Sequence, residues 1–180
     1  MLFRSGYNFG TIENCYVNAD FEFDWDSSTT SINRGGLVGC NYGGIIKKCY
    51  STGTIIDGGY CCGGLVGLNY GSIDECFSDC SISGRRIVGG LVGMCEKIES
   101  FTGTISNSYS NSQTTISTTM SSARKGIGGI LGVLLTGSIT NCYATGLVDN
   151  SVDTNVTSGG LIGVNRSEEH TSELQSRQSI

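Results

Sequence analysis

The feature that most constrains the fold of this chain is a five-residue phrase, GGLVG, first seen at residues 35–39. It recurs unchanged at 63–67 and 89–93, and with conservative changes at 128–132 and 159–163. Five copies within 180 residues indicate a repeat protein. In such a protein each repeat packs only on its neighbours, so the hydrophobic core is a column whose length follows the number of repeats.

A second phrase, Gly-x-Ile-x-x-Cys-Tyr, follows every glycine phrase except the last. Its copies begin at Gly10, Gly44, Gly71, Gly103 and Gly137, at spacings of 27 to 34 residues. The 28 Gly, the absence of Pro and the 15% of charged residues favour short strands and tight turns over helices. A strand, a corner, a second strand and a glycine-rich return describe one coil of a solenoid, stacked on the next at about 4.8 Å. We therefore predict an all-β fold, a β-solenoid resembling a parallel β-helix, of about five coils with one per glycine phrase.

The pattern within each repeat predicts which side chains face inward. The two residues between the Ile and the Cys are polar in every copy, which breaks the alternation of a strand and predicts a corner. From the Cys onward, small and apolar residues alternate with outward Tyr, Thr and Asp. Burial as a small hydrophobic residue is the plainest interpretation of the repeated Cys. The predicted core ladders are Leu37, Leu65, Leu91, Ile130 and Leu161; Ile12, Ile46, Ile73, Ile105 and Ile139; and Cys15, Cys49, Cys76 and Cys142.

The glycine phrase would be apolar on both faces of a strand, since the adjacent residues Leu37 and Val38 would point to opposite faces. Such a pattern is typical of a strand that is covered on both sides. We therefore expect the phrase to be a buried strand, with the variable loops between repeats on its outer face.

The aromatic residue after each Cys is the best candidate for a binding surface. These residues are Tyr16, Tyr50, Phe77, Tyr109 and Tyr143. Stacked outward rings could contact glycan rings or a partner protein. The alternative is that the rings only stabilise neighbouring coils through cross-strand pairing.

The two phrases together carry a resemblance to a known family. The pairing of GGLVGxN at 35–41 and 63–69 with Gly-x-Ile-x-x-Cys-Tyr-x-Thr-Gly at 44–53 and 137–146 resembles the GLUG-motif repeat. That repeat occurs in large bacterial surface proteins, including adhesin-like proteins and regions that flank immunoglobulin A peptidases. The resemblance implies a secreted or cell-surface stalk or adhesion segment. It brings no catalytic residues to this chain, and host glycans or host proteins are the expected partners.

The end of the chain departs from the repeat. After Asn165 the string that begins Arg166-Ser-Glu-Glu-His resembles the translation of a sequencing-library adapter. We therefore expect residues 166–180 to be a non-native assembly artefact, and residues 1–165 to be a solenoid fragment without caps. Open β ends of this kind predict self-association.

Several classes of function are disfavoured by the residue inventory. The net charge of −5 argues against nucleic-acid binding, which needs clustered Lys and Arg. No run of 18 apolar residues predicts a membrane span. The single histidine, His170, lies in the suspect tail, so triads built on histidine lack their base. No Cys-x-x-Cys pair predicts a zinc site. We expect no catalysis, no cofactor and no metal, while disulfides remain open for Cys61, Cys62, Cys80 and Cys95.

One acidic stretch leaves room for other chemistry. Between residues 20 and 26 the chain alternates strictly, and its outward row is Asp20, Glu22, Asp24 and Asp26. Such a row could bind Ca²⁺ through carboxylate oxygens. On a β-helix it could also process a polysaccharide, which is the alternative function. The simplest interpretation is a solvated strand face.

Overall fold

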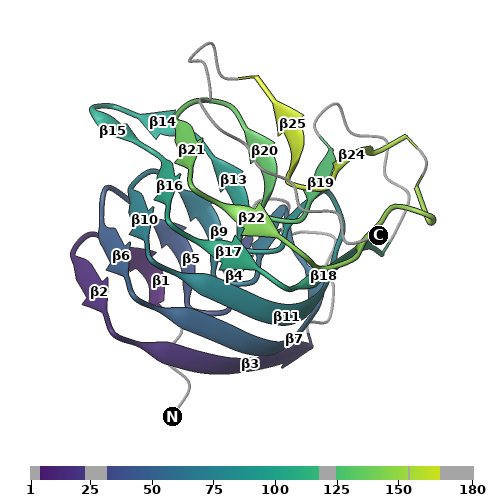
Figure 1. Ribbon diagram of the computed structural model, residues 1–180, viewed down its shortest axis with the longest axis horizontal. Helices are drawn as coiled ribbons and strands as arrows, with labels where there is room; N and C mark the ends of the chain where they lie inside the picture. Colours follow the sequence, from purple (N-terminus) through teal and green to yellow (C-terminus); the bar gives the residue numbers. More distant parts are fainter. Residues whose placement is uncertain (1–4, 23–31, 118–124, 154, 167–180) are drawn as a thin grey trace.

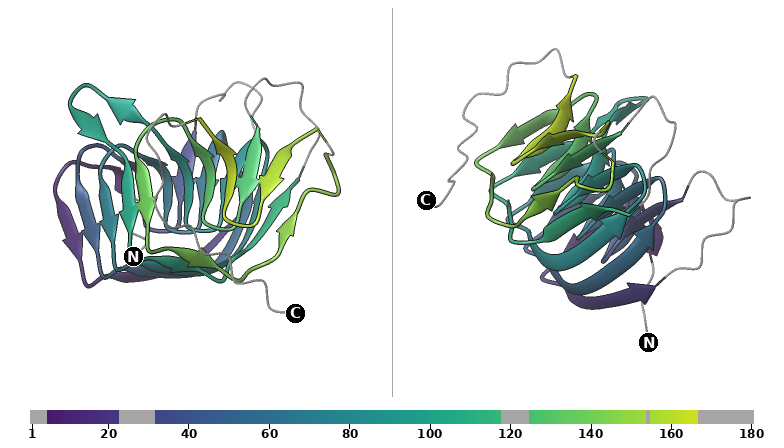
Figure 2. Two further views of the ribbon diagram at one scale, coloured as in Figure 1. Left: turned by 45° about the horizontal axis from the view of Figure 1, so that its top comes forward. Right: turned by 90° about the vertical axis from the view of Figure 1, so that its right-hand side faces the viewer.

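A computed structural model describes residues 5–22, 32–117, 125–153 and 155–166, and the statements below concern these residues (Figure 1). They form 25 strands and no helix. Four parallel sheets run along a single column, and each coil of the chain passes through them in the same order (Figure 2). The prediction of an all-β solenoid is confirmed.

We label the sheets A to D in the order in which a coil enters them. Sheet A contains β1 (Ser5–Asn8), β5 (Val38–Asn41), β9 (Val66–Asn69), β13 (Val92–Cys95), β20 (Leu131–Leu134) and β25 (Ile162–Asn165). Sheet B contains β2 (Thr11–Glu13), β6 (Ile45–Lys47), β10 (Ser72–Asp74), β16 (Thr104–Ser106) and β21 (Ser138–Thr140). In sheet B the five isoleucines of the second phrase pair directly with one another, from Ile12 through to Ile139.

Sheet C has the longest strands, and two of its five coils are interrupted. Its unbroken strands are β3 (Tyr16–Glu22), β7 (Tyr50–Gly58) and β11 (Phe77–Gly84). Its interrupted strands are β17 (Tyr109–Ser110) with β18 (Gln113–Ile116), and β22 (Tyr143–Ala144) with β23 (Val148–Asp149). Sheet D contains β4 (Asn33–Gly35), β8 (Cys61–Gly63), β12 (Ile87–Gly89), β19 (Gly126–Gly128) and β24 (Thr157–Gly159).

The corner predicted between the Ile and the Cys lies between sheets B and C. It turns on one residue per coil in the left-handed region, with φ between 48° and 55°. These residues are Asn14, Lys48, Glu75, Asn107 and Asn141. Asn tolerates this conformation, whereas Lys and Glu adopt it at a cost.

The expectation that the glycine phrase is one buried strand is wrong. Its first glycine ends a strand of sheet D, the next two residues bend, and its valine begins a strand of sheet A. A side chain on the second glycine of the third coil's phrase, Gly90, would collide with the Gly129 carbonyl and with the Ser110 hydroxyl. The phrase is therefore a corner whose second position must be glycine. Its consecutive residues are both apolar because the chain turns between them.

The inward ladders meet in the largest of three hydrophobic clusters. Ile46, Ile73, Ile105 and Ile139 are buried with Leu65, Leu91, Ile130 and Leu161, and with Cys49, Cys76 and Cys142. Ile12 and Leu37 are partly buried against the same cluster. Cys15, which we expected in the core, is exposed. It lies on the first coil, where no described coil covers its other side.

A buried asparagine ladder follows sheet A. Asn8 Nδ2 donates to Asn41 Oδ1 at 2.8 Å, and Asn41 Nδ2 donates to Asn69 Oδ1 at 2.9 Å. Cys95 and Leu134 take this place in the next two coils. An antiparallel hairpin of β14 (Lys97–Ile98) and β15 (Phe101–Thr102) projects from the column directly after Cys95, where the ladder stops (Figure 2).

Candidate binding surface

The predicted aromatic ladder stands on the outer face of sheet C as one continuous stack. Successive ring centroids are 5.2, 4.7, 5.0 and 5.1 Å apart from Tyr16 to Tyr143, and the planes differ by only 3° to 12°. Parallel in-register strands produce this geometry, because equivalent side chains repeat at the strand spacing.

This stacking limits what the ladder can bind. Each inner ring has a neighbouring ring on both faces, so only its edge meets solvent. The end rings keep one open face, and Tyr16 is 71% and Tyr143 44% exposed. A sugar that stacks on an aromatic face therefore has no access to the middle of the ladder, and the geometry favours a stabilising role for Tyr50, Phe77 and Tyr109.

A polar row runs beside the ladder, two residues further along each strand of sheet C. Thr145 Oγ1 donates to Asn111 Oδ1 at 2.8 Å, and Asn111 Nδ2 donates to Asp79 Oδ1 at 3.2 Å. In the first two coils, Thr52 Oγ1 donates to Asn18 Oδ1 at 3.3 Å. The row thus holds carboxylate, amide and hydroxyl groups in fixed positions along the column.

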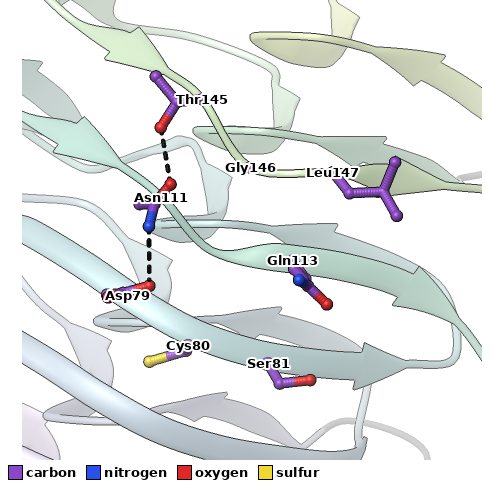
Figure 3. Close-up of a pocket in the computed structure, with 8 residues that line it drawn as sticks. All are labelled: Asp79, Cys80, Ser81, Asn111, Gln113, Thr145, Gly146 and Leu147. Carbon is purple, nitrogen blue, oxygen red and sulfur yellow. Dashed lines mark hydrogen bonds between the residues drawn. The ribbon is translucent and has the colours of Figure 1, made fainter.

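A groove with a volume of about 370 Å³ opens beside this row in the third to fifth coils (Figure 3). Its lining comes from β11, from the start of β18 and from the interruptions in the two following coils. The lining residues are Asp79, Cys80, Ser81, Asn111, Gln113, Thr145, Gly146 and Leu147.

The groove exists because the strands of sheet C break here. Ser112 takes the inward place that Cys80 holds in β11, and it is fully buried. Its Oγ accepts from Cys80 N at 3.0 Å and lies 3.1 Å from Ser78 Oγ. In the next coil a side chain on Gly146 would collide with the Ser112 carbonyl. A buried serine and a closely packed glycine thus fill the inward position, and the surface is hollowed where the pairing of the outward residues beside them is lost.

The acidic row contributes little to this surface. Asp20 is exposed, but its Oδ1 accepts from Thr54 N at 3.0 Å and its Oδ2 from Asn18 Nδ2 at 3.4 Å. Its carboxylate therefore links the first coil to the second. Glu22 is exposed at the end of β3, and Asp24 and Asp26 lie outside the described residues.

A second group of aromatic residues, which our sequence predictions missed, lies at the junction of sheets A and B. Phe9, Tyr42 and Tyr70 each follow an asparagine of the buried ladder, and Phe101 of the hairpin packs on Tyr42 at 6.0 Å. Here the rings are tilted, at 46° between Phe9 and Tyr42 and 63° between Tyr42 and Tyr70. The recurrent Asn-aromatic-Gly triplet was the available sequence signal.

Comparison with known protein families identifies the repeat that the chain contains. The sequence model described as the GLUG motif matches residues 31–56 and 123–151. The chain carries GLUG motifs. Each matched segment contains one glycine corner followed by strands of sheets A, B and C, so a GLUG motif corresponds to most of one coil. Searches of curated proteins and of solved structures gave no match.

All nine cysteines of the chain are free thiols, and Cys15 alone is exposed. Burial raises the pKa of the Cys40, Cys80 and Cys142 thiols to about 11, and that of Cys62 and Cys95 to about 12. These buried thiols stay protonated near neutral pH, which makes them poor nucleophiles.

Two negative findings complete the description of the surface. Within the ranges that the structure describes, no three His, Cys, Asp or Glu side chains gather as a metal site. Nor do those residues form a long apolar helix of the kind that crosses a membrane.

Proposed function

We propose that this chain is a non-catalytic stalk and adhesion segment of a large extracellular cell-surface protein. The GLUG motifs indicate a repeat domain. The setting of this repeat in bacterial surface proteins supports the extracellular assignment, and the scarcity of histidine supports the non-catalytic one.

The observation that carries the proposal is the unbroken register of the column. Ile12, Ile46, Ile73, Ile105 and Ile139 pair in sequence, and sheet A continues through all coils to β25. Each coil adds about 4.8 Å, so five coils span roughly 25 Å. A column held by strands that are paired on both sides and by side-chain ladders is a stiff spacer whose length depends only on the number of repeats.

Two experiments test this proposal. Antibodies raised against the purified chain should label intact, unpermeabilised cells of the source organism, and labelling that requires permeabilisation would contradict an extracellular location. In single-molecule pulling, the full chain between two marker domains of known length should resist extension and then unfold in cooperative steps. A chain that extends without a force peak would contradict the spacer role.

The alternative, a polysaccharide-processing enzyme that uses the acidic row, is tested separately. The purified chain should release no reducing ends from acidic or neutral polysaccharides over a prolonged incubation. Turnover that disappears in both the Asp20→Asn and Asp24→Asn variants would overturn the non-catalytic assignment.

A further inference from the structure

We propose that the groove beside Asp79, Asn111 and Thr145 binds a neutral oligosaccharide. This inference rests on the adhesive part of the proposed function and assigns it a place and a ligand class. It moves recognition away from the aromatic ladder, whose inner ring faces are covered.

The chemistry of the lining selects the ligand. The groove offers the Asp79 carboxylate, the amides of Asn111 and Gln113, and the hydroxyls of Ser81 and Thr145, and no Lys or Arg lines it. Sugar hydroxyls both donate and accept, so they can pair with carboxylates, which accept, and with carboxamides, which donate and accept. With a single carboxylate and no cation, the groove disfavours phosphates and uronic acids.

Several of these groups have hydrogen-bonding capacity to spare. Asp79 uses Oδ1 to accept from Asn111, and within the described part of the chain Asp79 Oδ2 has no partner. The same is true of the Gln113 carboxamide and the Ser81 hydroxyl, both of which are exposed. Figure 3 shows Gln113 and Ser81 on the neighbouring coils beside the Asp79 and Asn111 row. A ligand would therefore gain hydrogen bonds here without breaking those that hold the row.

The groove also has an apolar side. Leu147 is 63% exposed at the edge of the lining, next to Gln113 in Figure 3. A pyranose ring has an apolar C–H face and a rim of hydroxyls, so it matches a site with an apolar patch beside convergent polar groups. A simple ion would leave the apolar patch unused.

The direction of the row favours an oligosaccharide over a monosaccharide. The groove volume lies near the lower end of the range of about 300–1,000 Å³ for ligand pockets. The polar row continues beyond the groove to Thr52 and Asn18 in the first two coils. A chain of sugars along the column would meet a similar polar side chain at each coil, because the coils repeat at the strand spacing.

The test is calorimetric titration of the full chain with cellohexaose, mannohexaose, xylohexaose and chitohexaose, and with hexagalacturonate as an acidic comparison. We expect at least one neutral hexasaccharide to bind and hexagalacturonate to bind more weakly. Gln113→Ala should weaken binding about five- to tenfold, the loss of roughly one hydrogen bond. Glu13→Ala, an exposed change on sheet B, should leave binding unchanged.

Asp79→Asn provides a second variant that keeps the acceptor for Asn111. It should preserve the fold by circular dichroism and reduce the preference for neutral over acidic ligand. The proposal is overturned if no neutral hexasaccharide binds, if hexagalacturonate binds best, or if Gln113→Ala and Asp79→Asn both bind like the unmodified chain. Failure here leaves the cell-labelling and pulling results untouched, so the two proposals can fail independently.

Discussion

The middle coils and the outermost coils of this chain use the same phrases in different surroundings. Gly90 would collide with two neighbours if it carried a side chain, whereas a side chain on the equivalent Gly160 would meet no atom of the described residues within 4 Å. Cys76 is buried, whereas the equivalent Cys15 is exposed. The comparison teaches that a motif residue has no fixed energetic role, because the coils on either side of it determine its role. Stability in such a column is a sum over neighbouring pairs.

The largest expected difference between the two regions is in thiol reactivity. In the native chain one thiol, Cys15, should react with Ellman's reagent at least roughly 1,000-fold faster than the rest, because a buried thiol needs local opening that costs about 4 kcal/mol or more. In urea all nine should react. Cys15→Ser should abolish the fast phase. A second fast thiol in the native chain would show that a middle coil opens as easily as the first.

The next difference is steric. Gly90→Ala should lower the free energy of unfolding by about 3 kcal/mol, since the added methyl meets the backbone of the next coil, which cannot move aside. The matched Gly160→Ala should change it by less than about 0.5 kcal/mol. Urea denaturation measures both. Equal losses would mean that the corner, and not the neighbouring coil, requires glycine.

A smaller, pH-dependent difference lies between the third and fourth coils. Hydrogen bonds from Asn107 Nδ2 and Ser106 Oγ, each at 2.8 Å, lower the pKa of Asp74 below its ordinary value near 3.8, with Lys47 adding to the effect. A lowered folded pKa contributes stability above pH 3.8, and this contribution is lost as the pH falls through the folded value.

Asp74→Asn should therefore cost about 1 kcal/mol at pH 7. The gap between the two proteins should close when urea denaturation is repeated at decreasing pH below 3.8. Asp149→Asn is the control on an outer coil, where the pKa is lowered by Ser151 of the same loop and no other coil is involved. A gap that does not change with pH would contradict the inter-coil role of Asp74.

The smallest expected effect is a gain. Lys48 occupies the left-handed corner position with φ 52°, where Asn stands in the first, fourth and fifth coils. Lys48→Asn should raise the free energy of unfolding by about 0.5–1 kcal/mol, because Asn tolerates this conformation better. Lys48→Ala, which removes the charge and keeps the strain, should bring no gain. If both variants gain equally, charge and not backbone conformation sets the difference.

Much of the column could be predicted from the sequence because residues of the same type recur at the same position of each coil. The polar pair before each Cys marked the corner, and the isoleucine of the second phrase marked the inward position of sheet B. Both signals are local, and each coil repeats them.

The glycine corner could not be predicted in this way. Consecutive apolar residues fit a strand that is buried on both faces. They fit equally well a bend that turns successive side chains in different directions. The choice depends on contact with another coil, here between Gly90 and Ser110.

The groove could not be predicted from the sequence for a similar reason. It depends on where the strands of sheet C break, at Ser112 and Gly146, and neither residue differs in type from the many other Ser and Gly of the chain. The tilted aromatic cluster could have been predicted in part. Its Asn-aromatic-Gly triplet is visible in the sequence, but Phe101 reaches it from the hairpin, which does not repeat.

The hairpin and the interrupted asparagine ladder also bear on how the chain finds its register. Coils built from the same phrases can pair one step out of place, and a shifted pairing would satisfy most isoleucine and glycine contacts equally well. It would also bring Asn69 against Leu134 instead of Cys95, and would set the hairpin against the wrong coil. The irregular residues therefore specify the register, because only the correct neighbouring coil satisfies their contacts.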